Sequence, residues 1–244
     1  KQIIFVTSAS KKSLEDHFDH LEQLEDFYSK KGKDWAYKAI KEPADLAEFI
    51  FIRQKGPYGT GTAILNAKNL INEDEAFAVV YGDEIFDDFS GESHFKKIFD
   101  IYEKYQAPVL SFVSTNDEGT NKYGIIEGVE MSDGVYKVDR LLEKPGPQAT
   151  TSRICAVGGY VLTPDIFAEL EFLSQKKDRG EREFYLTDAI DRLIAKRDVY
   201  AKCTGYKYYD TGNKLNWLKA NIDLGLRDPE IGSDLADYLK NKIS

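Results

Sequence analysis

Four short segments of this chain combine residue types that suit phosphate chemistry. They are RQKGPYGTGTA (53–63), YGDE (81–84), LLEKP (141–145) and DTGNK (210–214). In this order they supply a glycine-rich loop, an acid after an apolar run, an acid–lysine pair and a second acid beside a lysine. Together they indicate a site for a nucleotide and a sugar phosphate, with metal-assisted phosphoryl chemistry.

Two aspartates are the candidate metal ligands. Asp83 follows the apolar run AFAVVYG and is expected at the end of a strand, and Asp210 ends the run YKYYD. Mg²⁺ takes oxygen ligands and keeps several waters, so one or two carboxylates suffice, and the shared metal would bridge two phosphates. The alternative for Asp83 is a helix N-cap or a strand-ending turn, because Asp is a favoured cap.

The glycine-rich segment 53–63 is a candidate base-recognition loop. Its glycines would let the backbone approach a flat base or a phosphate closely. The side-chain amide of Gln54 can both donate and accept hydrogen bonds, which matches the edge of a uracil. Taken alone, the segment is also typical of an ordinary glycine-containing turn, and the other segments favour the binding loop.

Glu143 and Lys144 are expected at the end of a strand that Pro145 stops. Adjacent strand residues point to opposite sides of a sheet, so contact with one ligand requires a local bend, which Pro145 could supply. An isolated Glu–Lys pair would otherwise be a solvated surface pair.

Three other polar residues carry weaker signals. Lys214 could reach a phosphate from the start of a helix, or could simply lie on the surface. His17 and His20 have a spacing that can ligate a metal on a helix. No third ligand is near them in the sequence and the helix is rich in acids, so we interpret this stripe as a solvated face.

Apolar runs and helical patterns alternate in the rhythm of βαβ units. Strands are predicted at 3–7, 50–54, 76–83 and 108–115. Near-continuous apolar runs such as FAVVYG suit strands that are buried on both faces. The sequence therefore predicts an α/β fold with a mostly parallel, doubly wound, Rossmann-like sheet that binds ligands at the carboxyl ends of its strands.

Further patterns complete the predicted fold. Segments 123–131 and 135–145, joined by an SDG turn, predict an added β-hairpin where a sugar-binding region begins. Helices are predicted at 184–197, 213–228 and 234–243. A helix near the start should cover one face of the sheet, since apolar residues recur at helical spacing: Leu14, Phe18, Leu21, Leu24 and Tyr28.

The composition is typical of a globular protein. With 42% apolar and 13% aromatic residues, 244 residues can form a sizeable core. The formal charge of −9 argues against a general nucleic-acid surface. Cys155 and Cys203 fit no disulfide or zinc pattern and are expected to be reduced thiols. No apolar run reaches the ~20 residues that span a bilayer and no leader is visible, which predicts a cytoplasmic protein without membrane partners.

The four segments, in this order, resemble those of bacterial UTP-glucose-1-phosphate uridylyltransferases in the sugar nucleotidylyltransferase family. The resemblance runs essentially from Lys1 to Ser244. It implies Mg²⁺-dependent nucleotidyl transfer from UTP to glucose 1-phosphate, giving UDP-glucose and pyrophosphate. We expect one domain, with nucleotide-binding residues in about 1–122, sugar-binding residues in about 123–212 and C-terminal helices in about 213–244. The amphipathic 13–28 segment could form a partner surface, and we expect a homo-oligomer.

The resemblance also implies roles for single residues. Gln54 and Gly59 would recognise the base, Glu143 would accept sugar hydroxyls and Lys144 would contact the sugar-linked phosphate. The catalytic candidates are therefore Asp83, Lys144 and Asp210. Weaker candidates for substrate contact are Gly82, Tyr123, Gly124, Val157, Gly158, Glu183 and Lys214.

One part of the family pattern is not found. The family opens with a strand and a GTR-bearing loop that holds the triphosphate, whereas residues 1–7 resemble the family's second strand and Met131 is the only methionine. We therefore expect an N-terminally shortened chain with impaired activity. The alternatives are a related enzyme that uses dTTP or ATP, and a non-catalytic sugar-nucleotide-binding module.

Overall fold

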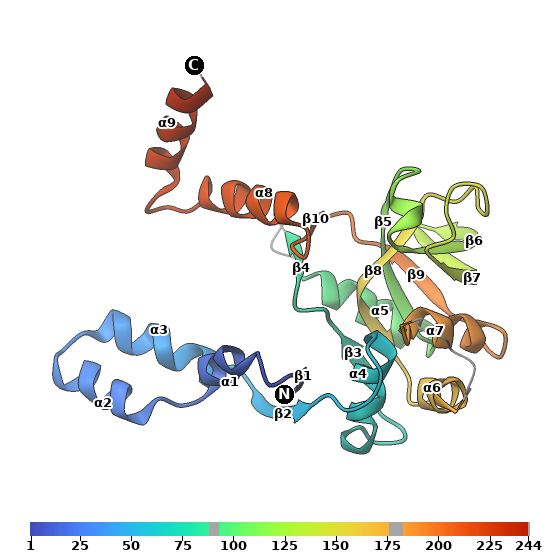
Figure 1. Cartoon of the computed structure of the whole chain (residues 1–244), viewed down its shortest axis with the longest axis horizontal. Helices are drawn as coiled ribbons and strands as arrows, with labels where there is room; N and C mark the ends of the chain where they lie inside the picture. The colour runs from blue at the N-terminus through green and yellow to red at the C-terminus, as the bar shows by residue number, and fades with distance from the viewer. Residues whose placement is uncertain (88–92, 176–182, 244) are drawn as a thin grey trace. The chain divides into compact units, whose positions relative to one another are not determined.

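The computed structural model describes residues 1–87, 93–175 and 183–243. The chain forms two compact units, Lys1–Glu75 with Pro164–Ala189, and Ala76–Thr163 with Ile190–Ser244 (Figure 1). Helices and strands occur in both units, as an α/β fold requires.

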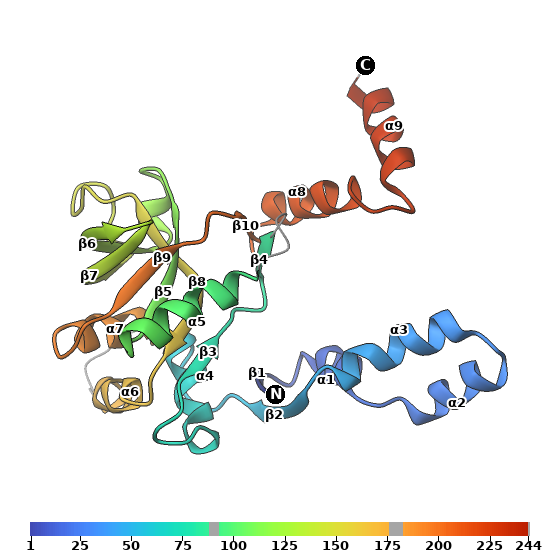
Figure 2. The same cartoon turned by 180° about the vertical axis from the view of Figure 1, so that it is seen from behind.

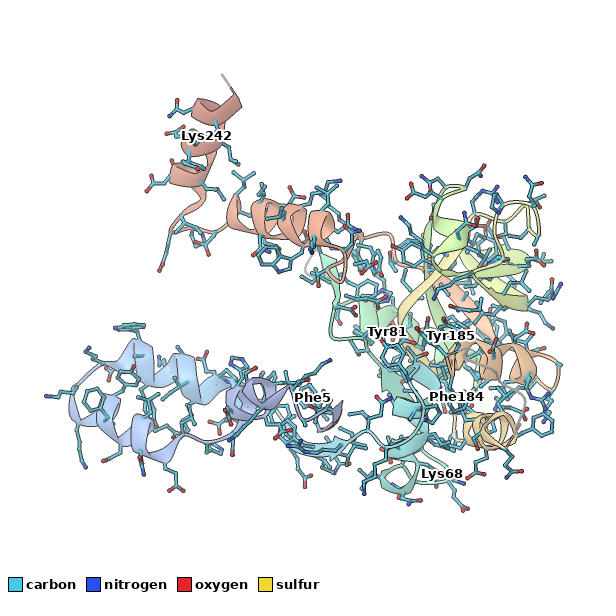
Figure 3. The ribbon with its side chains drawn as sticks, in the orientation of Figure 1. Phe5, Lys68, Tyr81, Phe184, Tyr185 and Lys242 are labelled. Atoms are coloured by element: carbon cyan, nitrogen blue, oxygen red, sulfur yellow. The ribbon has the colours of Figure 1, made fainter. Side chains whose placement is uncertain are left out.

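The first unit contains a pair of parallel strands, β1 (Gln2–Thr7) and β2 (Glu48–Arg53). Phe5 of β1, labelled in Figure 3, stacks on Phe49 and Phe51 of β2 with ring centroids 5.8 and 5.3 Å apart. The pair is parallel because a helical crossover joins its strands. The other elements of this unit are α1 (Lys12–Phe18), α2 (Glu22–Lys30), α3 (Asp34–Asp45), α4 (Thr60–Ala67), the 3-10 turn η1 (Lys68–Leu70) and α6 (Ile166–Ser174).

The single helix predicted over Leu14 to Tyr28 is wrong, because the segment forms two helices. Helix α1 ends before Asp19, whose backbone is extended with φ −96° and ψ 154°. The Oδ1 atom of Asp19 accepts a hydrogen bond of 2.9 Å from the N–H of His20. Phe18 of α1 still packs on β1, 5.1 Å from the ring of Phe5. No residue of α2, which the structure describes in full, is buried, and α2 lies along α3 (Figures 1 and 2).

The glycine-rich loop ahead of α4 is held by the backbone of Phe184, labelled in Figure 3. The Phe184 N–H donates to the carbonyl of Tyr58 over 2.9 Å, and its carbonyl accepts from the N–H of Gly61 over 2.8 Å. Gly59 has φ 137°, and a Cβ there would overlap the Phe184 backbone. Glycine is therefore required at position 59 for packing as well as for conformation.

The second unit holds a six-stranded sheet in the order β3–β8–β5–β9–β7–β6. Helix α5 (His94–Tyr105) packs on β5 and β8 (Figure 1). Every residue of β8 after Ile154 is buried, which suits a strand covered on both faces. The strands of this sheet are β3 (Phe77–Val79), β5 (Val109–Ser114), β6 (Gly124–Ser132), β7 (Val135–Glu143), β8 (Ile154–Leu162) and β9 (Tyr200–Cys203).

The strand directions correct the prediction of a mostly parallel sheet. Among the described strands of the large sheet, only β5 and β9 pair in parallel. The predicted hairpin of β6 and β7 is confirmed, and its turn residues Asp133 and Gly134 have φ 51° and 69°. Positive φ at both central residues is the turn geometry that joins antiparallel neighbours, so local turn chemistry accounts for this pairing.

The chain segments that carry the acidic motifs form a separate two-stranded ribbon. Strand β4 (Glu84–Asp87) pairs antiparallel with β10 (Lys207–Asp210), and Glu84 stands opposite Asp210. Phe86 and Tyr208 of this ribbon pack against a buried cluster on β6 and β8. The ribbon is therefore attached to the large sheet through its aromatic side chains.

The three helices predicted towards the C-terminus are confirmed as α7 (Leu186–Ile194), α8 (Lys214–Gly225) and α9 (Gly232–Ile243). Arg227, just after α8, donates to both carboxylate oxygens of Asp87 on β4, one bond measuring 3.0 Å. The hydroxyl of Tyr209 on β10 donates to Asp223 of α8 over 2.7 Å. Helix α8 is thus tied to both strands of the ribbon. None of the described helices is long and apolar enough to cross a membrane.

Candidate active site

The β4–β10 ribbon brings Asp83 and Asp210 together. Asp210 is the last residue of β10, as predicted. The prediction that Asp83 ends a strand is wrong: β3 ends at Val79, and Gly82 and Asp83 form the turn that enters β4. Thr211, the neighbour of Asp210, holds the two aspartates close together, because its N–H and its hydroxyl each donate to the carbonyl oxygen of Asp83 over 2.7 Å.

Gly212 leaves a space that both carboxylates face. A Cβ atom at this position would lie 2.9 Å from Oδ2 of Asp83 and 3.1 Å from Oδ1 of Asp210. Two carboxylate oxygens that converge in this way suit a hard divalent cation that completes its shell with water or substrate oxygens. Among the described residues, no group of three or more His, Cys, Asp or Glu side chains is arranged so that it could hold a metal ion, so such a site would rest on two carboxylates.

The surroundings of Asp210 hold it in place. Tyr123 donates its hydroxyl proton to Oδ2 of Asp210 over 3.0 Å. Burial and this hydrogen bond raise the pKa of Tyr123, so the hydroxyl remains a donor at neutral pH. Asn213 caps α8 by accepting from two backbone N–H groups, which places exposed Lys214 at the first position of the helix.

Glu84 is a third carboxylate beside this pair. Its Oε1 accepts a hydrogen bond of 2.7 Å from the hydroxyl of Tyr208. Burial, with smaller effects of the charges of Asp83 and Asp210, raises the pKa of Glu84 to about 7, while contacts with Gly158 and Tyr208 act in the opposite direction.

Glu143 ends β7, as predicted, and Lys144 supplies the bend that was expected from Pro145. Lys144 has φ 48°, a left-handed conformation that costs a non-glycine residue roughly 1–2 kcal/mol. Its Nζ lies 3.3 Å from Oε1 of Glu143, whose side chain is only 8% exposed. Backbone strain at a charged pair is typical of functional positions.

The candidates on β6 and β8 lie next to this pair. Gly124 stands opposite Glu143 in the β6–β7 ladder. The N–H of Lys144 donates to the carbonyl of Tyr123 over 3.2 Å. Buried Val157 of β8 belongs to the cluster against which Tyr123 packs. The second unit therefore brings together the candidates for the sugar phosphate and those for the metal.

The remaining candidates belong to the first unit. Gln54 follows β2, and its N–H extends the ladder with a bond of 2.9 Å to the carbonyl of Thr7. Glu183 directly precedes Phe184, whose backbone packs on Gly59. The structure thus groups Glu183 with the base-side residues, and gives Gly59 a packing reason in addition to its expected contact with a base.

Glu84 and Tyr208 were not predicted as site residues, although Glu84 lies in the YGDE segment and Tyr208 in the run YKYYD that leads to Asp210. Glu84 is the last letter of YGDE, and Tyr208 stands two residues before Asp210, on the same face of a strand. The pairing of β4 with β10 is what connects them. His17 and His20 are exposed, and His20 Nδ1 lies 3.3 Å from Oε1 of Glu25.

This fold is that of an enzyme that transfers nucleotidyl groups. A family model described as nucleotidyl transferase matches residues 1–225, and the chain belongs to that family. It is 38% identical over 244 residues to UTP--glucose-1-phosphate uridylyltransferase YngB of Bacillus subtilis. The aligned region covers 100% of this chain and 80% of that protein.

Two solved structures show the same relationship at 30% identity. The UTP-bound UGPase from Acinetobacter baumannii superimposes with a TM-score of 0.85, over 98% of this chain and 82% of that one. A UDP-glucose pyrophosphorylase complexed with UDP-glucose gives a TM-score of 0.78, over 90% of this chain and 79% of that one. These relatives support the Rossmann-like architecture predicted from the sequence.

Proposed function

We propose that this protein transfers the uridylyl group of UTP to glucose 1-phosphate, giving UDP-glucose and pyrophosphate. The observation that carries the proposal is the convergence of Asp83 and Asp210 on the space at Gly212, in the same unit as the Glu143–Lys144 pair. The named relatives, one bound to UTP and one to UDP-glucose, support these substrates over dTTP or ATP.

The reaction needs positioning rather than a covalent intermediate. A phosphate oxygen of glucose 1-phosphate attacks the α-phosphorus of UTP, and the bond from this phosphorus to the oxygen that bridges to the β-phosphate breaks, releasing pyrophosphate. Lys144 holds the phosphate of the sugar and Glu143 accepts its hydroxyls. Gln54 and Gly59 contact the uracil. Alignment of two anions in this way can supply several kcal/mol of the barrier, ~7–11 in well-oriented model reactions.

Asp83 and Asp210 are the proposed ligands of Mg²⁺, a metal that would neutralise phosphate oxygens when bound. Their fit to a cation rests on the two carboxylate oxygens that converge at Gly212. Tyr123 keeps Asp210 oriented. The remaining proposed substrate contacts come from Gly82, Gly124, Val157, Gly158, Glu183 and Lys214, and a homo-oligomer stays a prediction.

The test measures pyrophosphate release from UTP and glucose 1-phosphate, with ATP, CTP or dTTP as the competing nucleotide. UTP should be strongly preferred, because a site that bonds one base edge leaves buried groups unpaired with another. Asp83→Asn and Asp210→Asn keep the side-chain size and remove the charge, so each should lower the rate at least ~100-fold.

The matched control is Asp100→Asn on α5, whose side chain is 56% exposed and pairs with Lys96 one helical turn away. A surface pair of this kind contributes little, so turnover should be unchanged. Equal rates with ATP would overturn the base assignment. Normal turnover in both Asn variants of the ribbon would overturn the metal assignment.

A further inference from the structure

Glu84 lies where the ribbon that carries the metal candidates meets the large sheet. It follows Asp83 directly and stands opposite Asp210 in the β4–β10 ladder. Residues directly opposed on antiparallel strands project to the same face, and Tyr208, two residues before Asp210, shares that face. Glu84 therefore has a proposed metal ligand on each side, although it was assigned no role above.

The carboxylate of Glu84 is held between two elements. Tyr208 of β10 donates to Oε1 over 2.7 Å. Oε2 fills the space left by the missing side chain of Gly158 on β8, where a Cβ would overlap this oxygen and lie 2.9 Å from the Glu84 Cδ. Oε2 is inaccessible to solvent and makes no hydrogen bond of good geometry with any described residue, although the Gly158 backbone faces it. A substrate therefore does not reach Oε2.

Few directional contacts locate the ribbon on the sheet. Phe86 and Tyr208 attach it through apolar packing, which is non-directional. Among the described residues at the end that carries the acids, the bond from Tyr123 to Asp210 connects the ribbon with the sheet. The bond from Tyr208 to Glu84 joins the two strands of the ribbon to each other, and Glu84 meets the sheet where its Oε2 packs on Gly158 of β8. Loss of the Glu84 side chain would remove both the bond between the two strands of the ribbon and the packing on Gly158.

We infer that Glu84 is a positioning residue for the proposed uridylyl transfer: it holds Asp83 and Asp210 in place against the β8 backbone at Gly158 without touching the substrate. The inference rests on the proposed function for the identity of the reaction. The placement of the two aspartates can be tested by metal binding alone. Groups that orient metal ligands typically contribute ~10- to 100-fold in metal affinity.

The test begins with Mn²⁺ titrations of the intact protein without substrate, followed by electron paramagnetic resonance. Glu84→Ala removes both contacts and should weaken Mn²⁺ binding by ~10-fold or more, with a matching rise in the Mg²⁺ concentration needed for half-maximal pyrophosphate release. Glu84→Gln keeps the size and an oxygen for Tyr208, so it should restore binding to near the wild-type value. Glu103→Ala, at an exposed position of α5, is the matched control.

A second variant perturbs the same contact from the other strand. Gly158→Ala places a methyl group where Oε2 lies, so it should displace the carboxylate and weaken Mn²⁺ binding in the same way. In the double variant with Glu84→Ala the overlap with Oε2 is gone and the contact with Cδ2 of Tyr81, 2.9 Å from the added Cβ, remains. The combined loss should therefore be smaller than the sum of the two single losses. If Glu84→Ala does not fold, Gly158→Ala and Glu84→Gln provide the same comparison.

Thermal midpoints separate positioning from simple stabilisation. A purely structural role would lower the midpoint of Glu84→Ala and leave its Mn²⁺ affinity unchanged, and that result would overturn the inference. A loss of Mn²⁺ affinity in Glu84→Gln as large as that in Glu84→Ala would also overturn the inference. Absence of uridylyl transfer in the wild-type protein would instead overturn the proposed function, while the Mn²⁺ comparison would still decide the role of Glu84.

Discussion

The hydroxyl of Tyr123 donates a hydrogen bond to Oδ2 of Asp210 over 3.0 Å. Tyr123 directly precedes β6, and Asp210 ends β10, so one bond connects the large sheet with the ribbon. The other oxygen of Asp210 accepts from the N–H of Gly212 over 3.1 Å and faces the space shared with Asp83. Asp210 is therefore oriented before any metal or substrate arrives.

Removal of this hydroxyl should affect the metal more than the fold. Tyr123→Phe leaves Asp210 oriented only by its bond from the N–H of Gly212, so the Mg²⁺ concentration for half-maximal turnover should rise by about 10-fold. The matched control is Tyr136→Phe, which also removes a tyrosine–carboxylate bond, 3.1 Å long, to Glu130 of the β6–β7 hairpin. Equal Mg²⁺ dependence of the two variants would contradict the role given to Tyr123.

Lys144 should serve one substrate only. Lys144→Ala removes a charge-assisted contact to the sugar phosphate, so calorimetry should show a loss of about 10-fold or more for glucose 1-phosphate and a smaller loss for UTP. Lys144→Gly should lose the same affinity. It should be at least as stable as Lys144→Ala, because φ 48° costs glycine nothing. Equal losses for both ligands would show that Lys144 is not specific to the sugar phosphate.

Arg227 should stabilise the ribbon. The side chain of Asp87 is 7% exposed and that of Arg227 is 38% exposed, so Arg227→Met leaves a buried carboxylate without its partner. The free energy of unfolding should fall by about 2 kcal/mol, below the range for fully buried pairs, because water reaches the arginine. Urea denaturation measures this change. The double variant Arg227→Met with Asp87→Leu should regain most of the lost free energy of unfolding. If it does not, the destabilisation does not come from the unpaired carboxylate of Asp87.

Cys155 should resist alkylation in the folded protein. Its side chain is 1% exposed, and burial, with smaller effects of Glu84 and Asp210, raises the pKa of the thiol to about 12. Only the thiolate reacts, so iodoacetamide at pH 8 should modify half-buried Cys203 and spare Cys155 until denaturant is added. Peptide mass spectrometry follows both sites, and comparable rates in the native state would contradict this burial.

The raised pKa of the Cys155 thiol also predicts how the stability of the protein changes with pH. The pKa of the thiol is higher in the folded state than its ordinary value of 9.0, so the unfolded chain loses this proton first. The contribution of Cys155 to stability is therefore complete below pH 9 and declines as the pH rises towards 12. A Cys155→Ser variant should lack this part of the alkaline decline.

Much of the local structure could be read directly from the residues. The SDG turn predicted the β6–β7 hairpin because Asp and Gly accept positive φ, and the structure shows φ 51° and 69° at Asp133 and Gly134. Apolar periodicity predicted α8 and α9. Asp210 and Glu143 were expected at strand ends and lie there. Each of these predictions depends on residues that are close together in the chain, where propensity and turn chemistry act.

Other features depended on contacts between distant residues. The large sheet took antiparallel neighbours that apolar runs do not specify. Glu84 acquired its surroundings when β4 paired with β10, because its bonding partner Tyr208 is 124 residues away in the chain. The motifs therefore determined which acids were available for chemistry. The pairing of distant strands, which no local pattern encodes, decided that Asp83 and Asp210 converge at Gly212 and that half-buried Glu84 packs on Gly158 beside them.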